Sequence, residues 1–205
     1  MNSPFLATAV LCFITFTARC DELAEYTRLF EADGTYFEEK RVLQEKYRKA
    51  VADRVSRADK VEVYLLDFDA QPEGKMGFGH LKEDQFPIPP DEGVSKILSR
   101  KILNADELAV FRPALRATLS AKENQDLTLC HFPVHGVRVW AGNWVVFESS
   151  FCWKCQSFYI KYPDKAEWMN LPDPNLERVL RRIMPIPASE LERFEKKFSQ
   201  TRDPN

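Results

Sequence analysis

The stretch from Cys130 to Tyr162 constrains the fold more than any other part of this sequence. Two apolar and β-branched runs, at 137–140 and 145–147, flank the pair Gly142 and Asn143. A glycine at the first of two residues between such runs is typical of a tight β-hairpin turn. The sequence therefore predicts an antiparallel hairpin that brings the segments before and after it together.

The hairpin also predicts which residues face one another. With a two-residue loop, Ala141 lies opposite Trp144, and the same register places His135 opposite Ser150. Cys152 is then the diagonal neighbour of His135 on the same face of the sheet, roughly 7 Å away. This placement requires that the glycine after His135 introduces no bulge, because a slip of one residue reverses the faces.

The same stretch gathers cysteine and histidine side chains. It contains Cys130, His131, His135 and the Cys-x-x-Cys pair formed by Cys152 and Cys155. Three thiolates and one imidazole form a common tetrahedral ligand set for zinc. The candidate zinc ligands are therefore Cys130, His135, Cys152 and Cys155, with His131 as the alternative histidine.

Two other interpretations of these cysteines stay open. A structural disulfide, between Cys152 and Cys155 or from Cys130 to either of them, would suit an oxidising compartment. A thiol-based redox protein would use Cys152 assisted by His135. A thioredoxin-type centre needs its first cysteine at a helix N-terminus, whereas residues 156–162 have the aromatic and branched composition of a strand.

Motifs of hydrolytic enzymes do not occur in the chain. Neither Gly-x-Ser-x-Gly nor His-Glu-x-x-His is present, and both motifs place a nucleophile or a metal in a defined local structure. We name no catalytic residue and no cofactor other than zinc. The sequence favours a non-enzymatic protein in which the Cys/His cluster is structural.

The N-terminus has the composition of a processing signal. Residues 5–18 form an apolar run that suits the core of a signal peptide and is short for a membrane span. We expect residues 1–19 to be removed and the mature chain to be exported to the periplasm or cell envelope. In a lipoprotein-type alternative, Cys20 would carry a lipid and attach the protein to the membrane, although Arg19 is atypical of that signal.

The rest of the chain divides into a helical segment over residues 20–59 and an α+β domain over residues 60–205. Strands are predicted at 61–66 and 94–102. A helix is predicted after the N-cap Asn104, with either a kink or a later start near Val110 because of Pro113. Two further helices are predicted after 175 and 189, and the proline- and glycine-rich stretch 67–93 is predicted to be a loop. We expect an antiparallel sheet of about four to five strands with the helices packed on one face.

The charge pattern gives no indication of a nucleic-acid partner. The chain has 29 basic and 31 acidic residues and a net charge of −2. Basic residues alternate with acidic ones along the predicted helices, whereas a nucleic-acid-binding surface needs a concentrated basic patch. No feature of the sequence indicates an oligomer.

Three elements of the central stretch resemble a family of small exported bacterial proteins with no established activity. The elements are Cys130, the run His135-Gly136-Val137-Arg138, and the run from Phe151 to Gln156. The family carries Cys-x4-His-Gly-(Ile/Val)-Arg, an apolar strand and (Ile/Val)-Cys-x-x-Cys, and it ends in a helix with a proline-rich tail. The resemblance covers about residues 61–187, and it implies one cluster that contains Cys130, His135, Arg138, Cys152 and Cys155. Because Val134 replaces an arginine that the family usually carries, no anion-binding role is implied there.

Overall fold

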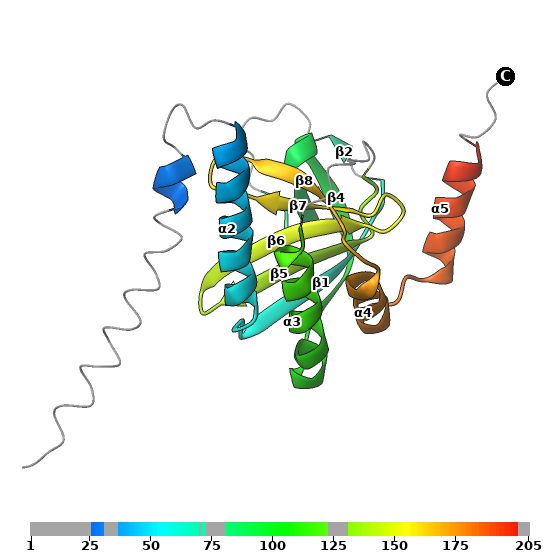
Figure 1. Cartoon of the computed structure of the whole chain (residues 1–205). Helices are drawn as coiled ribbons and strands as arrows, with labels where there is room; N and C mark the ends of the chain where they lie inside the picture. The colour runs from blue at the N-terminus through cyan, green and yellow to red at the C-terminus, as the bar shows by residue number, and fades with distance from the viewer. Residues whose placement is uncertain (1–25, 31–36, 70, 73–80, 123–130, 201–205) are drawn as a thin grey trace, which may run out of the picture.

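The computed structural model describes residues 26–30, 37–69, 71–72, 81–122 and 131–200. They form an α+β fold in which helices cover one face of an antiparallel sheet (Figure 1). The helices are α2 (Phe37–Val55), the short 3-10 helix η1 (Pro89–Asp91), α3 (Ala105–Ser120), α4 (Asn175–Ile183) and α5 (Ala188–Gln200). The strands are β1 (Lys60–Leu66), β2 (Gln71–Pro72), β3 (Gln85–Ile88), β4 (Gly93–Ile102), β5 (His135–Ala141), β6 (Trp144–Cys152), β7 (Ser157–Lys161) and β8 (Ala166–Asn170).

In the described part of the chain, the sheet has eight strands in the order β2-β4-β1-β5-β6-β7-β8, with β3 also paired to β4. The expected four to five strands were too few, for two reasons. The stretch 67–93 contains β2 and β3, because short strands at the edge of a sheet tolerate proline. The run 166–170 forms β8, which pairs along its whole length with β7.

Helix α3 begins at its predicted cap. The Asn104 side chain accepts a hydrogen bond from the Glu107 N–H (3.0 Å), and the Glu107 carboxylate accepts one from the Asn104 N–H (3.1 Å). This reciprocal pair is a capping box and satisfies two N–H groups at the helix start. Pro113 lies within the continuous helix, so the later start near Val110 is wrong. Its side chain is exposed, and the helix continues past it on the solvent side.

The main core lies between the helices and one face of the sheet. Alternate residues of the central strands point into it, such as Val61 and Val63 of β1 and Val137 of β5. Helix α2 contributes Val51, and helix α3 contributes Phe111, both almost fully buried. The N-terminal helix therefore packs on the same sheet as the remaining helices.

Helix α5 lies beside this body (Figure 1). The Phe194 ring packs edge-on against Phe68, with 5.0 Å between the ring centroids. Arg193 forms an ion pair with Asp67 (2.8 Å), and Lys197 forms another with Asp69. The Phe198 ring also packs edge-on against Phe132, with 4.5 Å between the centroids, and Lys154 lies over its face. The attachment of α5 thus combines ion pairs with a cluster of aromatic contacts.

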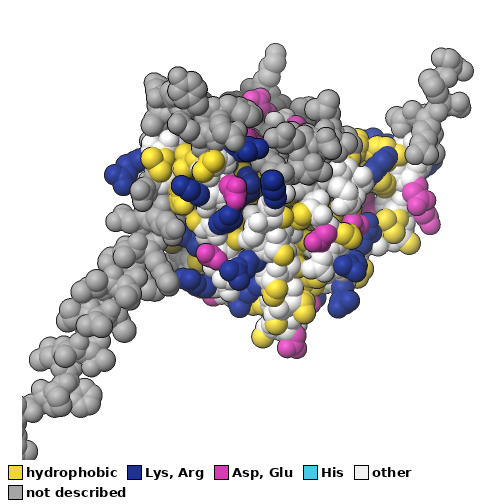
Figure 2. All heavy atoms as spheres, viewed as in Figure 1, with side chains coloured by type: hydrophobic (Ala, Val, Ile, Leu, Met, Phe, Trp, Pro, Cys, Tyr) yellow, Lys and Arg dark blue, Asp and Glu magenta, His cyan; other side chains and the backbone are white. Residues whose placement is uncertain are grey.

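The helix-covered face carries a mixed surface. Figure 2 shows Lys and Arg side chains spread over this face among acidic and apolar groups. Within the described ranges, no helix combines the length and the apolar composition that a membrane span requires.

Candidate functional site

The β5–β6 hairpin contains a bulge that changes the predicted register. Ala141 pairs with Trp144 across the turn, as predicted, and Gly142 adopts a positive φ of 58°. Trp140 still pairs with Val145, but Val139 pairs with Phe147, so Val146 has no partner on β5. One extra residue on a strand shifts all later pairs by one position.

The bulge places His135 opposite Phe151, and the predicted pairing with Ser150 is therefore wrong. Because side chains alternate along a strand, Trp153 rather than Cys152 shares the face of His135. The expected diagonal contact between His135 and Cys152 does not form for the same reason.

His135 is locked between two fixed partners. The Trp153 Nε1–H donates to His135 Nδ1 (2.7 Å), and His135 Nε2 lies 2.8 Å from the Met184 carbonyl oxygen. Since an indole N–H can only donate, Nδ1 must accept, and Nε2 carries the proton that the carbonyl accepts. The imidazole is 0% exposed, and burial lowers its pKa to about 4. His135 is therefore neutral at pH 7, and both of its ring nitrogens are in use.

Cys152 is a free thiol with 0% exposure. Its sulfur accepts a hydrogen bond from the Cys155 N–H (3.3 Å), which closes the tight turn between β6 and β7. Burial raises the pKa of the thiol, and nearby backbone N–H groups oppose this shift only in part. A reactive thiolate requires the opposite environment. Because Cys152 is free, the disulfide alternatives that include it are not formed in this structure.

His131 lies on the sheet face opposite to that of His135, between two serine hydroxyls. Ser150 Oγ is 2.8 Å from Nε2, and Ser157 Oγ is 3.0 Å from Nδ1. A hydroxyl beside an imidazole resembles part of a nucleophilic dyad. Both serines are buried, however, and burial lowers the pKa of His131 to about 3. In the structure, the imidazole and the two hydroxyls form a hydrogen-bond network that joins β6 to β7.

The structure describes only some of the candidate zinc ligands. Cys130 lies outside the described residues, while His135, Cys152 and Cys155 lie inside them. Among described residues no group of three or more His, Cys, Asp or Glu side chains could hold a metal ion. The four-residue set remains a prediction, although the lone pair that His135 would give to a metal is already bonded to Trp153.

A charged cluster on the sheet face opposite the helices was not predicted as a unit. Arg138 forms a two-point ion pair with Glu148, through Nε (2.7 Å) and Nη2 (2.6 Å). It also contacts the Tyr64 hydroxyl (3.3 Å), and that hydroxyl donates to the buried carboxylate of Glu62. Burial and the Glu62 hydrogen bond raise the pKa of Tyr64. The sequence signal for this cluster is Glu62, an acidic residue inside an otherwise apolar strand.

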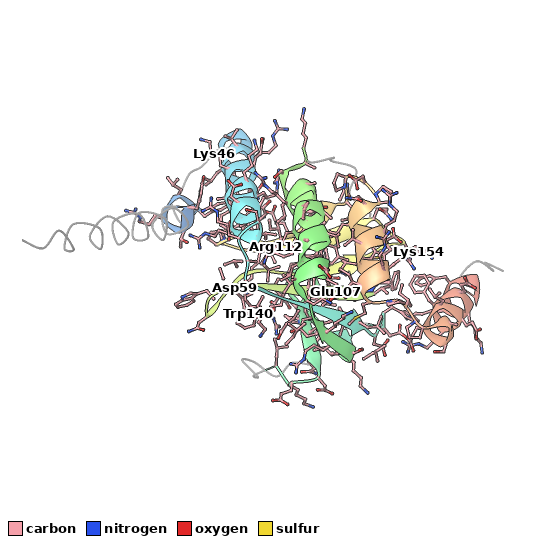
Figure 3. All side chains as sticks on the ribbon, turned by 90° about the horizontal axis from the view of Figure 1, so that it is seen from below. Lys46, Asp59, Glu107, Arg112, Trp140 and Lys154 are labelled. Atoms are coloured by element: carbon pink, nitrogen blue, oxygen red, sulfur yellow. The ribbon has the colours of Figure 1, made fainter. Side chains whose placement is uncertain are left out.

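A hollow of about 550 Å³ lies between β6 and β7, under α2. Its walls come from β5, β6, the end of β7 and helix α2; the residues are Tyr47, Val51, Arg138, Trp140, Val145, Val146, Phe147, Glu148, Ile160, Lys161, Tyr162 and Pro163. This volume is in the usual range for ligand sites. Figure 3 shows Trp140 near Asp59 at one end of the sheet, away from Lys154.

Comparisons with known proteins add no relative. No family model, no curated protein and no solved structure matches this chain. The functional argument therefore depends on the geometry of the described residues.

Proposed function

We propose that this chain is an exported, non-enzymatic protein in which the Cys/His region stabilises the fold. The observation that carries this proposal is the fully buried imidazole of His135, which joins the end of β6 to the end of α4 through Trp153 and Met184. A catalytic or ligating histidine needs a nitrogen that is free for its substrate or metal. Both nitrogens of His135 serve the fold instead.

The buried thiol gives independent support. Cys152 has no exposed surface and a raised pKa, which suits a structural cysteine and not a redox centre. Of the two cysteines in the described part of the chain, Cys152 is a free thiol. We propose that the disulfide expected from Cys130 is formed with Cys155.

Mass spectrometry with thiol labelling tests this proposal. The folded, unreduced chain should gain two hydrogens on reduction, and Cys152 should resist iodoacetamide until the protein is denatured. Rapid labelling of Cys152 near neutral pH would instead support the redox alternative. The Cys152→Ser variant is the control that assigns the label.

Metal content separates the proposal from the zinc alternative. The untagged protein should contain far less than one zinc per chain by elemental analysis. Stoichiometric zinc that is lost in a Cys155→Ser variant would favour a zinc module built from Cys130, His135 or His131, Cys152 and Cys155, and would contradict the structural proposal.

The export part of the proposal rests on the N-terminal sequence. The mature protein should begin at or near Cys20 when it is recovered from a secreting bacterial host. An added diacylglyceryl mass on Cys20 would assign the membrane-anchored form, whereas an intact N-terminus in the cytoplasm would contradict export.

A further inference from the structure

Strands β6 and β7 are neighbours along only a small part of their length. β6 pairs with β5 over most of its length, but with β7 only through Phe151–Phe158 and Cys152–Ser157. β7 continues to Lys161 and pairs throughout with β8. Among the described residues, the β6 segment 144–148 therefore has no strand partner on its edge toward β7.

The side chain of Ser149 bridges β6 and β7 at the point where the two strands separate. The Ser149 hydroxyl donates to the Tyr159 carbonyl (2.7 Å) and accepts from the Tyr159 N–H (3.1 Å). The Ser149 hydroxyl thus replaces the direct backbone hydrogen bonds between β6 and β7 at the point where the two strands diverge. Ser149 is fully buried, and its hydroxyl is hydrogen-bonded as buried polar groups usually are. This bridge therefore holds β6 and β7 apart beyond it.

The hollow in this gap has two chemically different sides. Phe147, Ile160 and Tyr162 face the helix-side core. The neighbouring residues Glu148 and Lys161 alternate with them along the strands and so lie on the opposite side. A chain laid between the two strands would meet apolar groups with one set of alternate side chains and charged groups with the other.

The charged side of the hollow is positive. Arg138 and Glu148 neutralise one another as an ion pair. Lys161 is exposed and, within the described ranges, forms no ion pair with a carboxylate. Trp140 also lines the hollow, and its buried Nε1–H has no acceptor among the described residues. An occupant with acidic side chains and with carbonyl oxygens would complement both groups.

We infer that the gap between β6 and β7 binds an extended peptide segment that alternates apolar and acidic residues. The peptide pairs its backbone with the open edge of β6 at residues 144–148, as in other cases of strand addition. Its apolar side chains pack against Val146, which lies half-buried at the edge of the helix-side core, and its acidic side chains approach Lys161. Trp144, which is 79% exposed at the hairpin end of this edge, covers one end of the segment. This binding role goes beyond the structural role of the Cys/His region and does not require it.

A synthetic peptide tests the inference directly. The probe is an end-capped peptide of alternating glutamate and valine, about seven residues long, which is a common strand length. The full mature chain is incubated with it, and amide hydrogen exchange is measured by mass spectrometry. The peptide should protect residues 144–148 selectively, and a lysine–valine peptide of the same length should bind more weakly.

Two controls separate strand addition from other modes of binding. Methylation of alternate peptide amides removes backbone donors and should abolish the protection. Lys161→Glu should weaken binding roughly fivefold or more, because one attraction becomes a repulsion. Lys96→Glu, at an exposed lysine on β4, makes the same charge change away from the hollow and should have no effect.

The inference is overturned by any of three results. These are an absence of protection at 144–148 with the glutamate–valine peptide, equal binding of the methylated peptide, or equal losses in Lys161→Glu and Lys96→Glu. Protection of the same amides that rises with protein concentration without peptide would assign the edge to a second copy of the chain and would also overturn it.

Discussion

At the scale of single residues, the neighbours of the buried His135 imidazole determine which of its nitrogens carries the proton. The indole of Trp153 fixes the acceptor nitrogen, and the carbonyl of Met184 fixes the donor. A proton added to Nδ1 would face another N–H, so protonation costs hydrogen bonding as well as desolvation. The low pKa of His135 follows from this arrangement.

This arrangement predicts a loss of stability in acid. The folded pKa of His135 is about 4, below the ordinary value of 6.5, so the unfolded chain takes up its proton first as the pH falls. Stability should be complete above about pH 6.5 and should decrease toward pH 4, by a total on the order of 3 kcal/mol from this residue. Urea unfolding between pH 7 and pH 4 measures the change.

The variant His135→Gln is the control for the acid effect. It should be less stable than the parent at pH 7 by about 2–4 kcal/mol, because it leaves the partners of His135 unsatisfied. It should also show a shallower slope with pH. The remaining slope should include His131, whose pKa is shifted in the same direction. An unchanged slope in His135→Gln would contradict the assignment.

Gly136 predicts a second effect at this scale. A methyl group at its Cα would lie 2.8–3.0 Å from ring atoms of Phe86, a fully buried side chain. Gly136→Ala should therefore destabilise the fold by about 1–3 kcal/mol through overpacking. Gly142→Ala is the comparison, since no atom lies within 4 Å of the added group but its φ of 58° costs about 1 kcal/mol. Equal unfolding midpoints for Gly136→Ala and the parent would contradict the steric argument.

At the scale of elements, the bulge at Val146 decides which residues of β6 face the core. With the bulge, Phe147 and Phe151 lie on the helix-covered face and Cys152 lies on the other. Without it, the pairing set by the turn would exchange these faces. The bulge therefore explains why His135 and Cys152 do not meet.

Deletion of Val146 tests the role of the bulge. The deletion should leave cooperative folding intact, because it removes the unpaired residue and keeps Phe147 opposite Val139 and Phe151 opposite His135. Insertion of one alanine between Phe147 and Glu148 should prevent cooperative folding, because it moves Phe151 from the core to the opposite face. Thermal unfolding followed by circular dichroism distinguishes the two variants, and equal stability of both would show that β6 does not depend on this register.

At the scale of the whole molecule, α5 is the least integrated helix. It is attached by the ion pairs of Arg193 and Lys197 with the loop after β1, and by ring contacts of Phe194 and Phe198. Exposed ion pairs contribute little to stability and are screened by salt. We therefore expect α5 to open independently of the core.

Hydrogen exchange measures this independence. Amides of α5 should exchange faster than those of α3, and 1 M salt, at which screening extends to about 3 Å, should increase the exchange of α5 further while leaving α3 nearly unchanged. Arg193→Ala at low salt should reproduce part of the effect. Equal protection of the two helices would show that α5 is part of the cooperative core.

The local features of the fold could be predicted from the sequence. The strand at 61–66, the glycine turn at Gly142 and the cap at Asn104 each depend on neighbouring residues, and each is confirmed. Such signals act over a few residues, where backbone preference and hydrogen bonding to adjacent groups decide the structure.

Long-range pairing decided the rest. Strands β2 and β3 form because β4 provides an edge for them, and their own sequence resembles a loop. The candidate site also combines local and long-range effects. The sequence identified His135 and Cys152 as candidate residues, but the unpaired Val146 in β6 places them on opposite faces of the sheet. No local rule predicts that bulge, because its cause is the fit of two whole faces, one against the helices and one against Phe86 and Tyr64. The sequence determined the elements and the chemically active residues, and the tertiary structure determined which of those residues meet, since a sheet exchanges its two faces with a shift of one residue.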